Sequence, residues 1–393
     1  MNFIQQAYKG KNDWWRYLLM TLFVFFGWQI IGIIPLVVVA LLNSNGIAEF
    51  ELAAADNFMS LGINSNLYLF SMIMMFAVGL FFIFLGIKSI HKRSITSLLT
   101  SRKKLDWKRV LFAFGVWFLI SLVILSIDYF GTPENFVWNF KLVPFLLLVA
   151  ISFLFLPLQT SFEEVLFRGY LMQSIGFSTT IDKFTLRFLL HVFGVICLLI
   201  FNYYIPTEII FLLIFLIIYL FLIEVFLMLN STKLIYNSIV YKQIKSFFSR
   251  NWVPLIVTSV SFGLLHSFNP EVDKLGKMVM VYYIGTGFLF GISTLMDEGM
   301  ELSLGMHAAN NIVAAVLVTT NWTVFQTDAL FIDTSEPSLG METYIPVFVI
   351  YPLLLLLFSK KYGWENWKEK LFGKIGKPII QSEDRSPLPN PQD

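Results

Sequence analysis

Long runs of apolar residues recur along the whole chain and are separated by short polar segments. Most runs have about 17 residues or more, enough for a helix to cross a hydrocarbon core of about 30 Å. The runs do not alternate polar with apolar residues, which argues against a membrane β-barrel. The pattern predicts an all-α, polytopic membrane protein with about ten spans. We expect them near 17–42, 67–87, 110–128, 142–160, 188–205, 208–229, 253–268, 279–296, 302–320 and 344–358.

Composition agrees with this prediction, because 57% of the 393 residues are hydrophobic and only 14% are charged. A soluble domain has about a quarter charged residues. The single cysteine, Cys197, excludes an intrachain disulfide framework and a cysteine-rich zinc site. The net charge of +2 gives no nucleic-acid signal, since the positive residues lie in short segments beside the spans.

The distribution of positive charge predicts the orientation of the chain in the cell membrane. Lysines and arginines crowd the segment 88–109 and the tail beyond 359, whereas the segments 43–66 and 321–343 carry acidic residues and no lysine or arginine. Positively charged loops stay inside the cell. We therefore expect both termini to be cytoplasmic, with the lipid bilayer as the protein's first partner.

Two adjacent carboxylates, Glu163 and Glu164, interrupt this apolar sequence. Ionisable groups in a membrane are costly unless they are paired or face water, so they mark functional sites. Pro157 and the spacing of Ser161 to Glu164 predict that one helix ends and a new one begins at Phe162. Glu164 and Arg168 are then four residues apart and can pair, which leaves Glu163 free to act as a base. A capped helix with an interfacial salt bridge is the structural alternative.

Two further motifs place a histidine and a second distinctive residue on one helix face. Phe262 and His266 are four apart, and so are His307 and Asn311. The pair of His307 and Asn311 can donate hydrogen bonds to an oxyanion, or His307 can bind a metal. The structural alternative is a polar pair that only holds two helices together. Span counting puts His266 at the far end of a short span, away from Glu163. Gly287 and Gly291 have the spacing of tight helix packing.

In this order, the three motifs resemble those of the CPBP intramembrane protease family, which contains type II CAAX prenyl endopeptidases and bacteriocin-processing or Abi proteins. The resemblance covers about Val143 to Val318. It implies that Glu163 activates water with the help of His266, that His307 and Asn311 stabilise the oxyanion, and that Glu164 and Arg168 support the site. The resemblance leaves two forms of the site open. In one, Glu163, His266 and His307 hold a divalent metal such as zinc; in the other, Glu163 holds a water molecule without a metal.

The resemblance divides the chain into four parts. Residues 1–141 hold N-terminal transmembrane helices of unknown role, and 142–320 form the protease-like core with a two-span insertion near 186–230. Residues 321–376 hold an outer loop, the last span and a basic cytoplasmic segment, and the proline-rich tail 377–393 is expected to be disordered.

Two classes of function follow. In the first, the protein is an intramembrane endopeptidase that hydrolyses a peptide bond of a membrane-associated peptide or protein near the cytoplasmic interface. In the second, it is a non-catalytic immunity or assembly factor that keeps the fold. The first class requires Glu163, His266, His307 and Asn311 to converge on one site.

Overall fold

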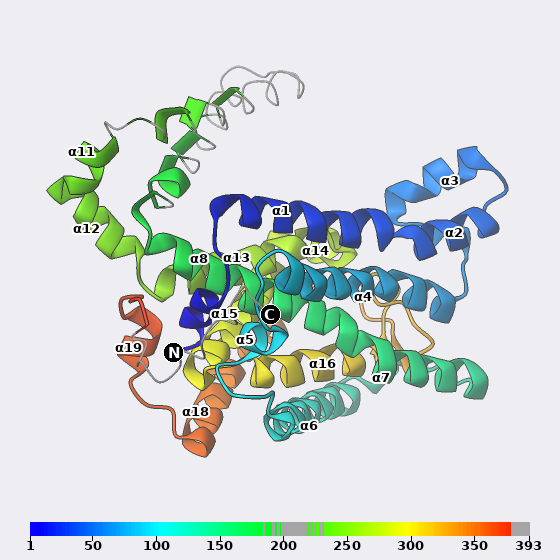
Figure 1. Cartoon of the computed structure of the whole chain (residues 1–393). Coiled ribbons are helices and arrows are strands. Elements are labelled where there is room, and N and C mark those ends of the chain that lie inside the picture. Colours follow the sequence, from blue (N-terminus) through cyan, green and yellow to red (C-terminus); the bar gives the residue numbers. More distant parts are fainter. Residues whose placement is uncertain are drawn as a thin grey trace, which may run out of the picture.

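The computed structural model describes residues 1–183, 185–190 and 232–378, together with isolated positions between 193 and 229. The two spans predicted near 188–205 and 208–229, the insertion near 186–230 and the tail 377–393 therefore lie wholly or largely outside the described residues. Figure 1 shows the described part as a bundle of helices.

The N-terminal half contributes the first long helices of the bundle. Two of them begin at capping side chains: Asn64 accepts a hydrogen bond from the backbone amide of Leu67, and Asp106 accepts one from that of Lys108. The elements of this half are α1 (Trp14–Phe25), α2 (Ile34–Asn43), α3 (Ile47–Ala53), α4 (Ser65–Ser89), α5 (Ile95–Leu99), α6 (Trp107–Gly131), β1 (Phe136–Trp138), α7 (Leu142–Glu164) and α8 (Met172–Thr179).

The C-terminal half supplies the remaining elements. They are α11 (Thr232–Asn237), α12 (Ile239–Phe248), α13 (Trp252–Leu265), α14 (Pro270–Leu275), α15 (Met280–Asp297), α16 (Glu301–Val316), β2 (Val318–Thr319), β3 (Phe331–Asp333), α17 (Met341–Ile345), α18 (Tyr351–Tyr362) and α19 (Trp367–Phe372).

Within the described residues, six helices are long and apolar enough to cross a membrane. The segment Trp252–Phe268 is a shorter apolar helix. The predicted class, a polytopic helical membrane protein, is confirmed, whereas the number of ten spans is not. The long helices are Trp14–Asn43, Ser65–Ser89, Trp107–Gly131, Leu142–Thr179, Lys277–Asp297 and Thr343–Tyr362.

The predicted helix boundary at Ser161 and Phe162 is wrong. Pro157 lies inside α7, and the helix continues through a π-helical turn at Val165–Leu171 into α8, so that Leu142–Thr179 is one helical segment of 38 residues. A bilayer supplies no water to satisfy a broken backbone, so a transmembrane helix tends to continue through proline. Ser161 is therefore an interior residue and makes no cap.

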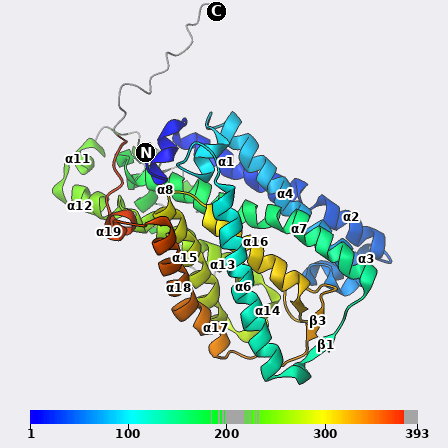
Figure 2. The same cartoon turned by 90° about the horizontal axis from the view of Figure 1, so that it is seen from below.

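The all-α prediction also misses a small sheet at one end of the bundle. β1 pairs antiparallel with β3, and β2 pairs parallel with β3, which gives the order β1-β3-β2. The sheet ties the segment after α16 to the segment before α7 (Figure 2). Part of the predicted outer loop 321–343 is thus ordered against the ends of two core helices.

The helices around the three motifs pack closely. α4 packs on α7, α6 on α16, and α13 on α15. The predicted role of the glycines is confirmed at Gly287, where an added Cβ would lie 2.4 Å from the backbone oxygen of Ser259. A glycine here lets α15 approach α13 more closely than any other residue would allow.

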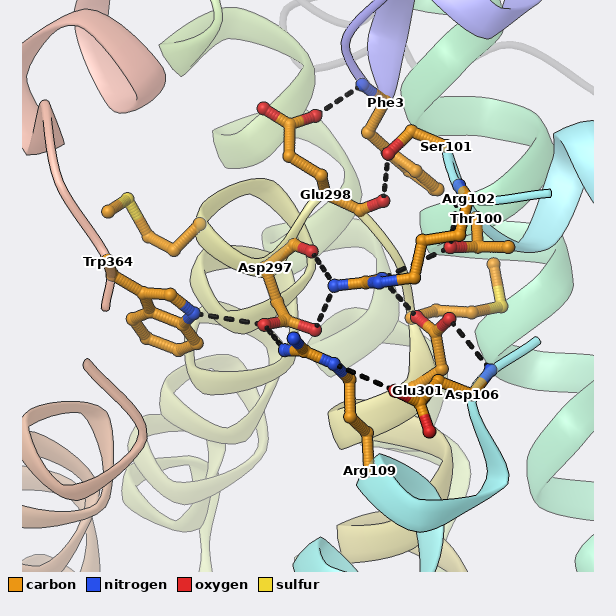
Figure 3. Close-up of polar contacts among 12 residues, drawn as sticks. Phe3, Thr100, Ser101, Arg102, Asp106, Arg109, Asp297, Glu298, Glu301 and Trp364 are labelled. Carbon is orange, nitrogen blue, oxygen red and sulfur yellow. Dashed lines mark hydrogen bonds and ion pairs between the residues drawn. The ribbon is translucent and has the colours of Figure 1, made fainter. Parts of the chain in front are cut away.

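An ionic network joins the end of α15 to the start of α16 (Figure 3). The carboxylate of Asp297, at the end of α15, contacts Arg102 at 2.9 Å, Arg109, and the indole nitrogen of Trp364 at 3.0 Å. Arg102 also pairs with Glu301 at the start of α16, at 3.0 Å. The network therefore fixes the first turn of the helix that carries His307.

Candidate active site

Glu163 lies near the end of α7 and is held by a neighbour on the same helix face. Gln159, four residues earlier, donates a hydrogen bond from Nε2 to Oε1 of Glu163. The other carboxylate oxygen, Oε2, is buried, has no hydrogen-bond partner, and lies 3.7 Å from Nε2 of His307. One oxygen of Glu163 is therefore positioned by the protein, and the other remains available to a ligand.

Glu164 and Arg168 form the predicted i, i+4 pair, at 2.9 Å between Oε1 and Nη1, and both side chains are fully buried. Arg168 also donates from Nη2 to the backbone oxygen of Gly287 at 3.1 Å, and its guanidinium lies 4.2 Å from the ring centroid of Phe262. Glu164 in turn accepts a hydrogen bond from Nδ1 of His307 at 2.9 Å. This one pair connects four helices, α7, α13, α15 and α16.

His307 therefore has a defined orientation. Because an ionised carboxylate only accepts hydrogen bonds, Nδ1 donates to Glu164, and Nε2 is the nitrogen near Glu163. The imidazole stacks on Phe290, with ring centroids 5.1 Å apart, and meets Phe262 edge-on at 5.8 Å. The first and third motifs thus meet, although 143 residues separate Glu164 from His307.

His266 follows the last residue of α13, and its predicted support by Phe262 is present, with ring centroids 4.8 Å apart. Its Nδ1 donates to the backbone oxygen of Phe262 at 2.9 Å, so Nε2 carries the lone pair. Tyr283 stacks on the other side of the imidazole at 4.5 Å. The 14 residues of α13 rise only about 21 Å, less than a bilayer core of about 30 Å, so this helix alone is too short to cross the core.

These residues line a single cavity of about 350 Å³. Glu163, His266, His307 and Asn311 all contribute to its wall. Met72, Ile73 and Phe76 of α4 form an apolar side, so the N-terminal helices also shape this space. The structure therefore brings the motifs together at one place and resolves the apparent conflict over the depth of His266. The catalytic roles of these residues stay predictions.

Sequence reasoning missed Gln159. Its Oε1 accepts a hydrogen bond from Nδ2 of Asn311 at 2.8 Å while its Nε2 donates to Glu163. An amide nitrogen has two hydrogens, so Asn311 keeps one for the cavity, and Asn310 donates to its oxygen at 3.1 Å. The signal was present, since Gln159 is four residues before Glu163 and must share its helix face.

The described residues do not fit a zinc site. A catalytic zinc ion needs three protein ligands, and no group of three His, Cys, Asp or Glu side chains among the described residues is arranged to hold a metal. His307 and Glu163 approach each other, but His266 does not complete a set with them. The metal alternative for Glu163, His266 and His307 is therefore unsupported.

Comparison with known proteins adds an independent observation. The family model described as type II CAAX prenyl endopeptidase Rce1-like matches residues 215–313, a range that holds the second and third motifs but not Glu163. The chain contains an Rce1-like domain. The chain is also 24% identical over 330 residues to an uncharacterized protein, YyaK, of Bacillus subtilis (strain 168), and the match covers 83% of this chain and 85% of that protein. No solved structure matches the chain significantly.

Proposed function

We propose that the protein is an intramembrane endopeptidase that uses Glu163 as a general base. The observation that carries this proposal is the convergence of Glu163, His266, His307 and Asn311 on one cavity. The Rce1-like domain supports the same class of reaction, because its family is one of proteases that act on peptides at membranes. The cavity is large enough for a peptide segment and a water molecule, and its mixed walls suit an amphipathic chain.

In this mechanism a water molecule lies between the free oxygen of Glu163 and Nε2 of His266. Glu163 accepts a proton from the water, His266 accepts a hydrogen bond that orients it, and the water oxygen attacks the peptide carbonyl carbon. When the C–N bond breaks, the proton on Glu163 passes to the leaving nitrogen. The products are a new carboxylic acid and a free amine, so atoms and charges balance without a further reactant.

The developing oxyanion needs hydrogen-bond donors. Asn311 has one amide hydrogen that Gln159 does not use. A protonated His307 donates from Nε2 as well as from Nδ1, which contacts Glu164 at 2.9 Å. Glu164 and Arg168 do not line the cavity, so we assign them positioning roles.

The test is peptide release from native membranes. Purified wild-type protein and the Glu163→Gln and His307→Ala variants are each added to membranes of a strain that lacks the gene, and the released peptides are identified by mass spectrometry. The wild type should release peptides that both variants fail to release. Equal release by all three proteins would favour a non-catalytic immunity or assembly factor.

A matched control separates chemistry from folding. Ser152 lies on α7 with a buried hydroxyl that has no hydrogen-bond partner, so Ser152→Ala removes a polar group from the same helix without touching the cavity. This variant should release the same peptides as the wild type. Thermal unfolding of each purified variant shows whether a loss of release reflects a loss of fold.

A further inference from the structure

The two ends of the helical body carry opposite charge. α8, α12 and α19 gather at one end, and α3, β1, β3 and α17 at the other (Figure 2). We name the first end the basic face and the second the acidic face. Residues at the basic face include Lys9, Lys11, Arg16, Lys88, Lys103, Lys108, Lys245, Arg250, Lys360 and Lys368, and those at the acidic face include Glu49, Glu51, Asp56, Glu134, Asp273, Asp328, Asp333 and Glu336. The acidic face also holds Lys141, Lys274 and Lys277, and the basic face also holds Asp13, Asp106, Glu298 and Glu369, but each group is the minority at its end.

Toward the basic face the cavity is closed. The next residues from its floor in that direction are Glu164 and Arg168, both fully buried, and Met306 and Ser303 of α16 are equally inaccessible. Beyond them lies the ionic network around Asp297 (Figure 3). Among the residues that the structure describes, these packed layers leave no route from the basic face to Glu163.

Toward the acidic face the cavity wall consists of loop residues that are partly accessible. Asn269 precedes α14, and Thr320, Thr323, Val324 and Phe325 follow β2; all are half-buried. We name these five residues the rim. Ala314, which faces the cavity from the last turn of α16, is exposed.

The two segments of the rim are joined by a buried carboxylate, Glu271. Glu271 accepts hydrogen bonds from Asn269 at 2.9 Å, from the backbone amide of Val324 at 3.1 Å, and from the hydroxyl of Tyr283. It thereby joins the two rim segments to α15. The entrance is a built feature of this end of the molecule.

We propose that the substrate enters from the acidic face and that its class is a peptide segment already outside the cytoplasm. Positively charged ends of membrane proteins stay inside the cell, so the acidic face is the outer one. This differs from the cleavage near the cytoplasmic interface expected from span counting. The access route stands on charge and packing alone, whereas the substrate class also rests on the proposed protease activity.

The charge of the cavity narrows the substrate further. Glu163 and Glu271 contribute to its wall, and the described residues that line it include no lysine or arginine. A free peptide carboxylate close to the cleaved bond would find no cationic partner there. The segment is therefore neutral or basic around an internal bond.

Cysteine accessibility tests the route without any substrate. In a Cys197→Ser background, which removes the single native cysteine, single cysteines replace Thr323 on the rim, Ser338 on the acidic face and Lys103 on the basic face. Intact cells are treated with a sulfonated maleimide that does not cross membranes. Thr323→Cys and Ser338→Cys should be labelled, and Lys103→Cys should be labelled only after permeabilisation.

Each other pattern overturns the proposal. Labelling of Lys103→Cys alone in intact cells would reverse the orientation, absence of all labelling before permeabilisation would refute outward access, and labelling of Ser338→Cys without Thr323→Cys would show that the rim is closed. Labelling should be unchanged in Glu163→Gln. The labelling pattern is therefore independent of proteolytic activity. A protein without protease activity can still show outward access, and a protease can still fail the labelling test.

The charge of the cavity is tested at Ala314→Cys with cationic and anionic methanethiosulfonate reagents of similar size. The ratio of cationic to anionic reaction rates should be higher there than at Ser338→Cys, and Glu163→Gln should lower it. An equal or lower ratio at Ala314→Cys would refute the proposed preference for neutral or basic segments.

Discussion

Removal of the Gln159 amide should reduce turnover while leaving the fold in place. Gln159 donates to one oxygen of Glu163 and accepts from Asn311 at 2.8 Å, so it joins the base to the oxyanion donor. Gln159→Leu replaces the amide by a branched apolar side chain that is one bond shorter and removes both hydrogen bonds. Glu163 would then have neither carboxylate oxygen held, and Asn311 would keep only its hydrogen bond from Asn310.

The size of the effect follows from the charge of Glu163. A hydrogen bond to a charged group contributes about 1.5–3 kcal/mol, and each 1.4 kcal/mol in a barrier is about a factor of ten in rate. If the loss is felt in the transition state, kcat should fall by about 10- to 100-fold. KM should change little, because Gln159 positions the reacting groups.

The assay measures initial rates on a peptide found in the membrane-release experiment. Ser152→Ala, on the same helix, is the control and should keep wild-type kcat. Gln159→Glu should lose more activity than Gln159→Leu, since a second carboxylate beside Glu163 repels it. If the Gln159→Leu variant keeps the wild-type kcat, the positioning role is refuted. If its KM is also raised, Gln159 acts in substrate binding instead.

Three further predictions concern stability and metal. Asp297→Ala should lower the free energy of unfolding by about 3–5 kcal/mol, because it removes the buried carboxylate that Arg102 and Arg109 share and leaves Arg102 with Glu301 and Arg109 with Asp106. Unfolding in denaturant measures this, and a change below about 1 kcal/mol would contradict it. Burial lowers the pKa of His91 from its usual 6.5, so on acidification the unfolded chain takes up a proton before the folded chain does. The contribution of His91 to the free energy of unfolding should therefore be fully present above pH 6.5 and decrease as the pH falls toward the folded pKa. The His91→Gln variant should not show this pH dependence. Thermal unfolding across this pH range measures the effect, and an identical pH dependence in His91→Gln would contradict it. Treatment with a chelator should leave peptide release unchanged, because the described residues offer no three-ligand site; stoichiometric zinc by elemental analysis, together with loss of release, would reverse this conclusion.

Features local to one helix could be predicted from the sequence. The pairing of Glu164 with Arg168 and the packing of Phe262 on His266 both follow from a spacing of four, and both are present. The close approach at Gly287 was equally legible in its spacing from Gly291. In these cases helical geometry alone determines which side chains meet.

Features that depend on the bilayer or on distant segments could not be predicted. Pro157 indicated a helix end, but the membrane environment favours a continuous helix. Arg102 and Arg109 were interpreted only as topology signals, whereas they are also partners of Asp297, 195 and 188 residues away. The meeting of Glu164 with His307 likewise requires the full packing of α7 against α16.

The buried pair of Glu164 and Arg168 also has a consequence for biogenesis. During synthesis, α7 is made before its later partners, because Gly287 and His307 lie 119 and 143 residues further along. A carboxylate and a guanidinium entering the membrane alone would each carry a large cost of insertion. Because both are on one face of one helix, they neutralise each other as soon as the helix forms. The helix that carries them can therefore be inserted into the bilayer before α15 and α16 are synthesised and pack against it.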